Sequence, residues 1–155
     1  MHMSKSETAS IFVSDPSPLR LTMLVFSGAS IMCVASAVDP LRAANRVAGR
    51  TVFDWTLVSA DGEPALTTSG LPVAVSERFD ASAKTDVLIA IGGFGTRYET
   101  APALVSGFRR AARQARAVGG IEAGGWLLGR AGLLEGGAGP THWEDLEDFA
   151  ASFPG

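Results

Sequence analysis

The segment from Val118 to Trp126 constrains the fold more than any other, because a short apolar strand there enters a glycine-rich turn from which a helix leaves. The turn contains the pattern Gly-x-Glu-x-Gly, with Glu122 at its centre. This spacing is typical of a nucleophile elbow, in which glycines permit a turn too tight for side chains at the flanking positions. The pattern predicts that Glu122 is the first residue after a strand, at the carboxyl edge of a sheet and beside the N-terminus of the next helix.

Apolar runs divide the rest of the chain into alternating strands and helices. The runs at residues 19–26, 53–59, 86–91 and 118–121 predict strands, and the segments 30–49, 102–118, 126–134 and 143–153 predict helices. This alternation implies an α/β fold in which a mainly parallel sheet has helices on both faces. Pro40 should kink or divide the first helix, and a short hairpin is expected around Ser69-Gly70.

The composition indicates one domain that does not bind DNA by itself. The 155 residues include 13 Lys and Arg against 16 Asp and Glu, whereas a nucleic-acid-binding domain usually carries a basic surplus. One cysteine, Cys33, allows no internal disulfide, which suits the reducing cytoplasm. Residues 21–38 carry no charge, but Ser27-Gly28 is typical of a turn between a strand and a helix, so we expect no membrane span.

Three features near the predicted strand ends could bind a ligand, and each also has a plainer interpretation. Glu122 would be a fixed anion that accepts backbone N–H groups, or an exposed residue of a glycine-rich turn. The loop Gly92-Gly93-Phe94-Gly95 could point its N–H groups into the same crevice, as an oxyanion hole does, or be a loop without a task. His142 could face the crevice, or cap the helix that follows it.

Four arginines lie along one side of the predicted helix at 102–118, namely Arg109, Arg110, Arg113 and Arg116. They could form a phosphate or nucleic-acid patch, but we favour a solvated helix face. One Cys and two His are too few for a usual metal cluster, and no third glycine completes a dinucleotide fingerprint after Gly95. We therefore expect neither a metal nor a cofactor.

Five stretches, in this order and spacing, resemble one family: residues 37–45, 92–94, 120–124, 130–136 and 141–144. They resemble the N-terminal domain of GlxA-type members of the AraC family of transcription regulators, over nearly the whole chain. The resemblance implies a class I glutamine amidotransferase-like (PfpI-type) fold with three flavodoxin-like layers. The start of the chain looks like a tag remnant, so residues 1–18 are expected to form a tag remnant and flexible lead-in, and 19–155 the sensor domain. Domains of this family continue further, so we expect either a sensor domain truncated at its C-terminus or a naturally short product. DNA would be bound by a C-terminal helix-turn-helix domain absent from this chain.

The chain departs from the enzymes of this fold at the residues that would do chemistry. Those enzymes place Cys at the elbow, where this chain has Glu122, and an acidic residue on the first helix, at or near Cys33. His142 matches their usual His, but without a thiol at the elbow it cannot complete a Cys–His pair. The resemblance therefore implies a non-catalytic ligand-sensing domain. A PfpI-type hydrolase or hydratase with an atypical elbow is one alternative, and a dimerisation remnant that binds nothing is another.

Regulators of this kind tend to respond to small amines, betaines or amino acids, so we expect a small cationic effector. A carboxylate beside aromatic rings would bind an ammonium group, and the N–H groups around Gly93 would receive a ligand carboxylate. The apolar face of the first helix near Met32 predicts a homodimer. The sequence names neither the effector nor the promoter nor the direction of regulation. The residues expected to line the site are Glu122, Ala123, Gly93, Phe94, Trp126, His142 and Trp143.

Overall fold

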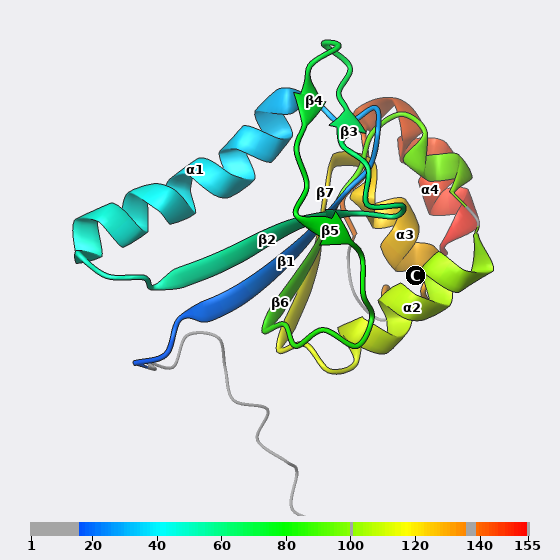
Figure 1. Cartoon of the computed structure of the whole chain (residues 1–155). Coiled ribbons are helices and arrows are strands. Elements are labelled where there is room, and N and C mark those ends of the chain that lie inside the picture. Colours follow the sequence, from blue (N-terminus) through cyan, green and yellow to red (C-terminus); the bar gives the residue numbers. More distant parts are fainter. Residues whose placement is uncertain (1–15, 100, 136–138, 155) are drawn as a thin grey trace, which may run out of the picture.

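A parallel sheet of five strands forms the centre of the molecule, in the order β5-β2-β1-β6-β7 (Figure 1). The computed structural model describes residues 16–99, 101–135 and 139–154, so most of the lead-in expected at 1–18 lies outside the described residues. The central strands carry the most apolar sequences, as expected for strands covered on both faces. The strands are β1 (Leu19–Val25), β2 (Phe53–Ser59), β5 (Glu77–Arg78), β6 (Val87–Ile91) and β7 (Ala117–Ile121).

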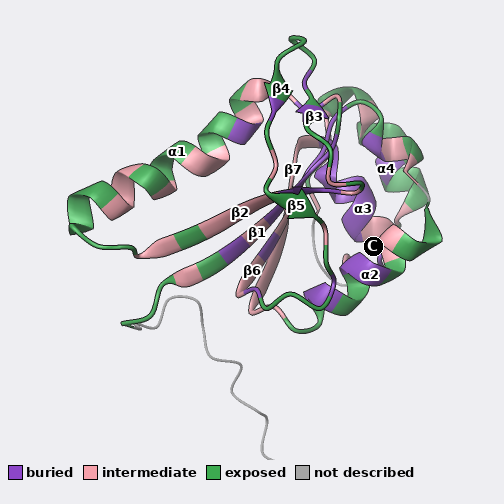
Figure 2. Cartoon of the chain, in the orientation of Figure 1, coloured by how far each residue is buried: buried purple, intermediate pink, exposed green. Residues whose placement is uncertain are grey.

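Helices cover both faces of this sheet, and the predicted fold class is confirmed (Figure 1). Helix α1 (Ile31–Ala48) packs on the face that receives Met23, while α2 (Pro102–Ala112) and α3 (Gly125–Arg130) pack on the face that receives Leu24. Adjacent residues of a strand point to opposite faces, so β1 contributes to both cores. Figure 2 shows that α1 leaves most of its surface exposed, whereas α3 is largely buried.

Helix α1 is unbroken through Pro40, so the expected division of this helix does not occur. Gly49 ends it in the left-handed conformation that glycine adopts readily, at a φ of 63°, and donates its N–H to the carbonyl of Arg46. Asn45 then joins the end of α1 to the start of β2. Its side-chain amide donates to the carbonyl of Phe53 and accepts from the N–H groups of Val52 and Phe53, at 2.7, 2.8 and 2.9 Å.

Two predicted helices are shorter than their sequence patterns suggested. Helix α2 ends at Ala112 rather than near Val118, because Val118 pairs with Leu88 in the sheet and the chain must turn before β7. The N–H groups of Arg116 and Ala117 fix this turn by donating to the carbonyl of Asp86. Helix α3 ends at Arg130 rather than Leu134, just before Gly132 takes a φ of 67°. In α2 a tertiary contact overrides the helical periodicity, whereas α3 ends just before a glycine that adopts the left-handed conformation.

The remaining elements lie at or near the carboxyl ends of the strands. The predicted hairpin is present as β3 (Ala65–Leu66) paired antiparallel with β4 (Pro72–Val73), and Gly28 donates its N–H to the carbonyl of Leu66. Three short 3₁₀ turns follow as η1 (Thr96–Tyr98), η2 (Glu122–Gly124) and η3 (Trp143–Asp145), and α4 (Leu146–Ser152) continues from the last of them. Among the described residues, no helix has the length and apolar character needed to cross a membrane.

Candidate functional site

A pocket of about 260 Å³ opens at the carboxyl edge of the sheet, where the turns after β1, β6 and β7 meet. Five of the seven residues predicted for the site line it together, although they come from three separate segments of the chain. Trp126 and Trp143 do not line it. The lining consists of Gly28, Ser30, Thr68, Gly92, Gly93, Phe94, Glu122, Ala123, His142 and Asp145.

Glycines let these turns approach one another backbone to backbone. A Cβ at Gly92 would overlap the backbone of Ala123 and Gly124, and a Cβ at Gly124 would overlap the carbonyl of Ala90. Gly93 faces the turn after β1 in the same way and forms an isolated β-bridge with Ala29. Packing therefore requires glycine at Gly92 and Gly93, because a side chain at either position would force these turns apart.

Glu122 directly follows β7, as the elbow pattern predicted. Its φ is 54°, and it is the one non-glycine residue with positive φ in the part of the chain that the structure describes. The left-handed conformation costs an ordinary L-residue on the order of 1 kcal/mol, and such residues are concentrated at functional sites. The strained turn holds the Glu122 side chain at the pocket wall.

The carboxylate of Glu122 accepts a hydrogen bond from the thiol of Cys33, with Sγ at 3.7 Å from Oε1. Cys33 lies in the first turn of α1 and is partly buried, packed against the apolar cluster beneath the helix. Burial raises the pKa of the Cys33 thiol, and the negative charge of Glu122 raises it further. The thiol therefore stays protonated at neutral pH and serves as a donor to Glu122.

His142 both caps a turn and lines the pocket, so its two interpretations from sequence are combined. It is the N-cap residue of η3, and Nδ1 accepts the backbone N–H of Glu144 at 3.4 Å. The imidazole ring lies between Phe94 and Trp143, with ring centroids 5.8 and 5.7 Å away. These contacts fix the orientation of the ring at the pocket wall.

Asp145 is a pocket residue that sequence reasoning missed. It lies in an acidic run after His142, which looked like the usual enrichment of acidic residues in the first turn of a helix. Its Oδ1 accepts from Arg97 at 2.6 Å, and its Oδ2 accepts from the indole of Trp126 at 3.3 Å. Because both oxygens have partners, the charge of Asp145 is already compensated by the protein.

The two tryptophans take other roles than the predicted aromatic wall. Trp126 is 4% exposed, and its ring packs edge-on against Phe149 and Phe153 at 5.1 and 5.6 Å. It is a core residue that reaches the pocket only through its hydrogen bond to Asp145. Trp143 is 77% exposed and lies against the outer side of His142.

The loop after β6 already uses two of its N–H groups. Gly92 donates to the carbonyl of Ile121 at 3.1 Å, and Gly93 donates to the buried hydroxyl of Thr96 at 2.8 Å. These two N–H groups of the loop around Gly93 are therefore not free to receive a ligand carboxylate. Across residues 16–99, 101–135 and 139–154, no three His, Cys, Asp or Glu side chains lie close enough together to hold a metal ion.

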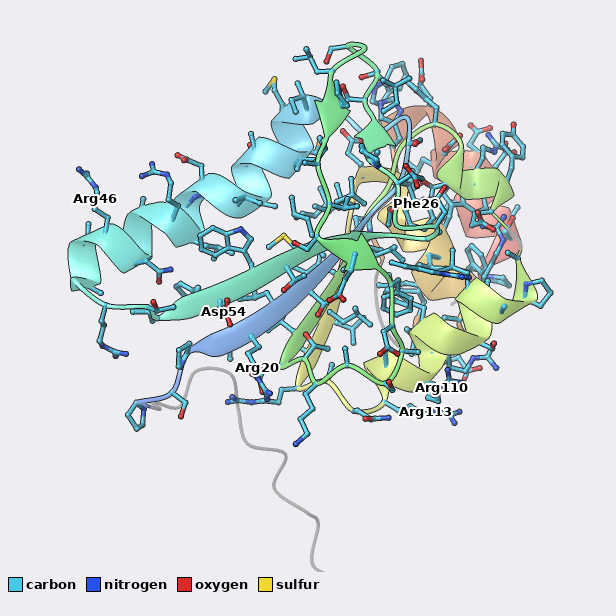
Figure 3. All side chains as sticks on the ribbon, in the orientation of Figure 1. Arg20, Phe26, Arg46, Asp54, Arg110 and Arg113 are labelled. Atoms are coloured by element: carbon cyan, nitrogen blue, oxygen red, sulfur yellow. The ribbon has the colours of Figure 1, made fainter. Side chains whose placement is uncertain are left out.

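The predicted arginine face on α2 is divided. The guanidinium of Arg109 turns toward α3 and donates to the carbonyls of Ala131 and Arg130, at 2.7 and 3.2 Å. Arg110 and Arg113 project from the outer side of α2 into solvent (Figure 3), and Arg116 lies beyond the helix. The four side chains do not form one patch.

Comparison with known proteins places these features in a family. The model of the DJ-1/PfpI family matches residues 20–152. The chain is 37% identical over 131 residues to the HTH-type transcriptional regulator CdhR of Pseudomonas aeruginosa, covering 84% of this chain and 39% of the relative. It is 31% identical over 136 residues to the HTH-type transcriptional regulator GlxA of Rhizobium meliloti, covering 87% of this chain and 42% of the relative. The chain thus spans about two fifths of the length of these relatives.

A solved structure shows the same arrangement of elements. The crystal structure of an AraC family transcriptional regulator from Pseudomonas putida superimposes with a TM-score of 0.76 at 26% identity, covering 88% of this chain and 74% of that chain. The resemblance to GlxA-type regulators of the AraC family, drawn from short motifs, is confirmed by these similarities.

Proposed function

This chain belongs to the DJ-1/PfpI family, and we propose that it is the effector-sensing part of a transcription regulator and not an enzyme. Its relatives CdhR and GlxA carry names of HTH-type transcriptional regulators. The observation that carries the proposal is the Glu122 carboxylate, held by a strained turn at the wall of a small pocket. A carboxylate there supplies a fixed charge for recognition where the enzymes of this fold supply a nucleophile.

The surroundings of Glu122 support a binding role over covalent catalysis. Covalent chemistry needs a thiolate, or a hydroxyl activated by a neighbouring base. The thiol of Cys33 has a raised pKa and donates to Glu122, so it is a poor nucleophile. In the described part of the chain, no hydroxyl or thiol hydrogen-bonds to His142. The residues expected of a hydrolase or hydratase are therefore not assembled around an activated nucleophile.

The proposed ligand is a small cation such as an amine or a betaine. The pocket volume of about 260 Å³ lies below the range of about 300–1,000 Å³ typical of pockets for drug-sized ligands, which favours a small effector. Glu122 supplies the negative charge, and Phe94 supplies an aromatic ring from another segment of the lining. A quaternary ammonium gains roughly 0.5–2 kcal/mol from each aromatic face that it contacts.

Dimerisation and DNA binding belong to the same proposal. The outer surface of α1 exposes Met32 and Val47, at 73% and 83%, and we expect α1 to contribute to a homodimer contact. DNA would be contacted in the cytoplasm by a separate helix-turn-helix domain of the kind named in the relatives, because this chain has a net charge of −3 and the four arginines at and after α2 do not form one patch.

Ligand titration against matched variants tests the proposal. We expect trimethylammonium compounds and small amines to raise the melting temperature of the wild type, because a ligand bound by the native state stabilises it. Glu122→Gln should weaken binding of a cation by about tenfold or more, since it removes a charged partner. Glu63→Gln, at an exposed carboxylate that does not line the pocket, is the control. Equal binding of the cation by wild type and Glu122→Gln would contradict the proposal.

A further inference from the structure

We infer that His142 supplies a hydrogen-bond donor, Nε2–H, to this pocket, so that the favoured ligand carries a carboxylate in addition to its cation. The inference rests on the proposed ligand-sensing function and specifies how the site selects its ligand. It assigns the ligand carboxylate to the side chain of His142, because the N–H of Gly93 already donates to the hydroxyl of Thr96.

The cap interaction fixes which nitrogen of His142 carries the proton. Nδ1 accepts the backbone N–H of Glu144, so it presents a lone pair, and the proton of the neutral imidazole must lie on Nε2. When the ring is protonated, Nδ1–H faces Oε2 of Glu144, which lies 3.5 Å away, and Nε2 keeps its proton. With the ring in this orientation, Nε2 is a donor in both charge states.

This donor has no protein partner among the residues that the structure describes. The His142 side chain is 25% exposed, and its ring belongs to the pocket lining. The rings of Phe94 and Trp143 contact the imidazole, and these contacts together with the cap restrict its motion before a ligand arrives. A donor ordered in advance binds an acceptor at a smaller entropic cost than a mobile one.

Glu122, His142 and Asp145 are the ionisable side chains of the pocket lining, and Asp145 already has protein partners for both of its carboxylate oxygens. The N–H groups of Gly92 and Gly93 have protein acceptors as well. Glu122 has a thiol as its donor, and a thiol is a weak donor that a ligand cation outcompetes. The pocket therefore matches a zwitterion, with its cation at Glu122 and its carboxylate at His142.

Two substitutions of His142 distinguish its role as a hydrogen-bond donor from its role as the N-cap residue of η3. The side-chain oxygen of Asn lies near the position of Nδ1 and is among the best N-cap acceptors, so His142→Asn keeps the cap of η3 and loses the donor. The amide nitrogen of Gln lies near the position of Nε2, so His142→Gln keeps the donor and loses the cap. If His142 has only a structural role, His142→Asn should be harmless and His142→Gln should be harmful. The inference predicts instead that His142→Asn loses the preference for a ligand carboxylate and that His142→Gln keeps it.

The experiment measures calorimetric affinities of glycine betaine and of tetramethylammonium, which carries the same kind of cation without a carboxylate. In the wild type, glycine betaine should bind about tenfold more tightly than tetramethylammonium, because a hydrogen bond to a charged acceptor is among the stronger ones. His142→Asn should lower this ratio to about one with tetramethylammonium binding unchanged, and His142→Gln should retain most of the ratio.

The outcomes also distinguish this inference from the proposed function. If tetramethylammonium binds the wild type and the ratio persists in His142→Asn, ligand sensing stands and the role of His142 is wrong. If the wild type binds both probes equally, the carboxylate preference is wrong. If neither probe binds the wild type, the proposed cation site fails, and the inference fails with it.

Discussion

The thiol of Cys33 lies 3.7 Å from Oε1 of Glu122, although the two residues are 89 positions apart in the chain. The fold thus brings a thiol from the first turn of α1 into contact with a carboxylate at the end of β7. In this arrangement the thiol has a raised pKa, because it is partly buried and lies beside the negative charge of Glu122.

The reactivity of Cys33 should depend on the charge of Glu122. Burial and the Glu122 carboxylate both disfavour the thiolate, so alkylation by iodoacetamide should have its half-maximal rate at a pH above the usual thiol value of about 8.5. In Glu122→Gln this midpoint should move down, because the nearby negative charge is gone. The rate is measured from pH 6 to 11, with Glu63→Gln as the control. A midpoint that is the same in Glu122→Gln and in the wild type would contradict the coupling.

Arg97 should stabilise the pocket through its ion pair with Asp145, which lines it. Its guanidinium donates to Asp145 and Asp148, at 2.6 Å each, and lies over the ring of Trp126. Arg97→Ala would leave Asp145, which is 15% exposed, without its cation. We expect this variant to lower the melting temperature and to weaken ligand binding. Arg110→Ala, which removes an exposed arginine from the outer side of α2, is the matched control and should change neither property (Figure 3). Equal melting temperatures for the two variants would show that the network contributes nothing.

Gly119 and Gly124, on either side of Glu122 in the elbow segment, should differ sharply in their tolerance of a methyl group. Gly124→Ala would drive a Cβ into the carbonyl of Ala90 and should cost about 3 kcal/mol or more in the free energy of unfolding. Gly119→Ala on β7 places its Cβ in open space and should be neutral or stabilising by up to about 1 kcal/mol, since alanine has less backbone freedom to lose. Urea denaturation of both variants checks the pair. A mild effect of Gly124→Ala would contradict the close backbone contact that shapes the pocket.

The sequence predicted the sheet and the elbow because these follow from local patterns. The apolar runs of β1, β2 and β6 stand out from their surroundings, and the glycine spacing places Glu122 after β7. The helix ends were predicted less accurately. The helical periodicity of α2 continues to Val118, but α2 ends earlier because Val118 pairs with Leu88 in the sheet. Local patterns carry no record of such a tertiary constraint.

The sequence predicted which residues gather at the candidate pocket, but it did not predict their polar contacts. The alternation of strands and turns brings Gly93, Phe94, Glu122, Ala123 and His142 to one edge, and this much follows from topology. Which partner satisfies each group depends on side-chain geometry. The sequence gives no sign that Trp126 turns into the core toward Phe149, or that Arg97 reaches across 48 residues to Asp145.

The strained backbone at Glu122 should lower the free energy of unfolding of the protein, and a substitution at this position should relieve the strain. Glu122 has a φ of 54°, which glycine adopts freely and glutamate adopts at a cost. Glu122→Gly should therefore raise the free energy of unfolding by about 1 kcal/mol and abolish binding of a cation. Asn tolerates this conformation better than most residues, so Glu122→Asn should fall between the wild type and Glu122→Gly in stability.

Glu122→Gln is the reference that isolates backbone strain from the loss of the carboxylate. It keeps the Cβ and the strained φ, and it removes the same charge beside Cys33 that Glu122→Gly removes. The stability difference between Glu122→Gly and Glu122→Gln, measured by urea denaturation, therefore reports the strain. A Glu122→Gly protein no more stable than Glu122→Gln would mean that the turn costs nothing. A positive difference, with cation binding lost in both variants, would mean that the fold tolerates a strained residue here for the sake of its ligand.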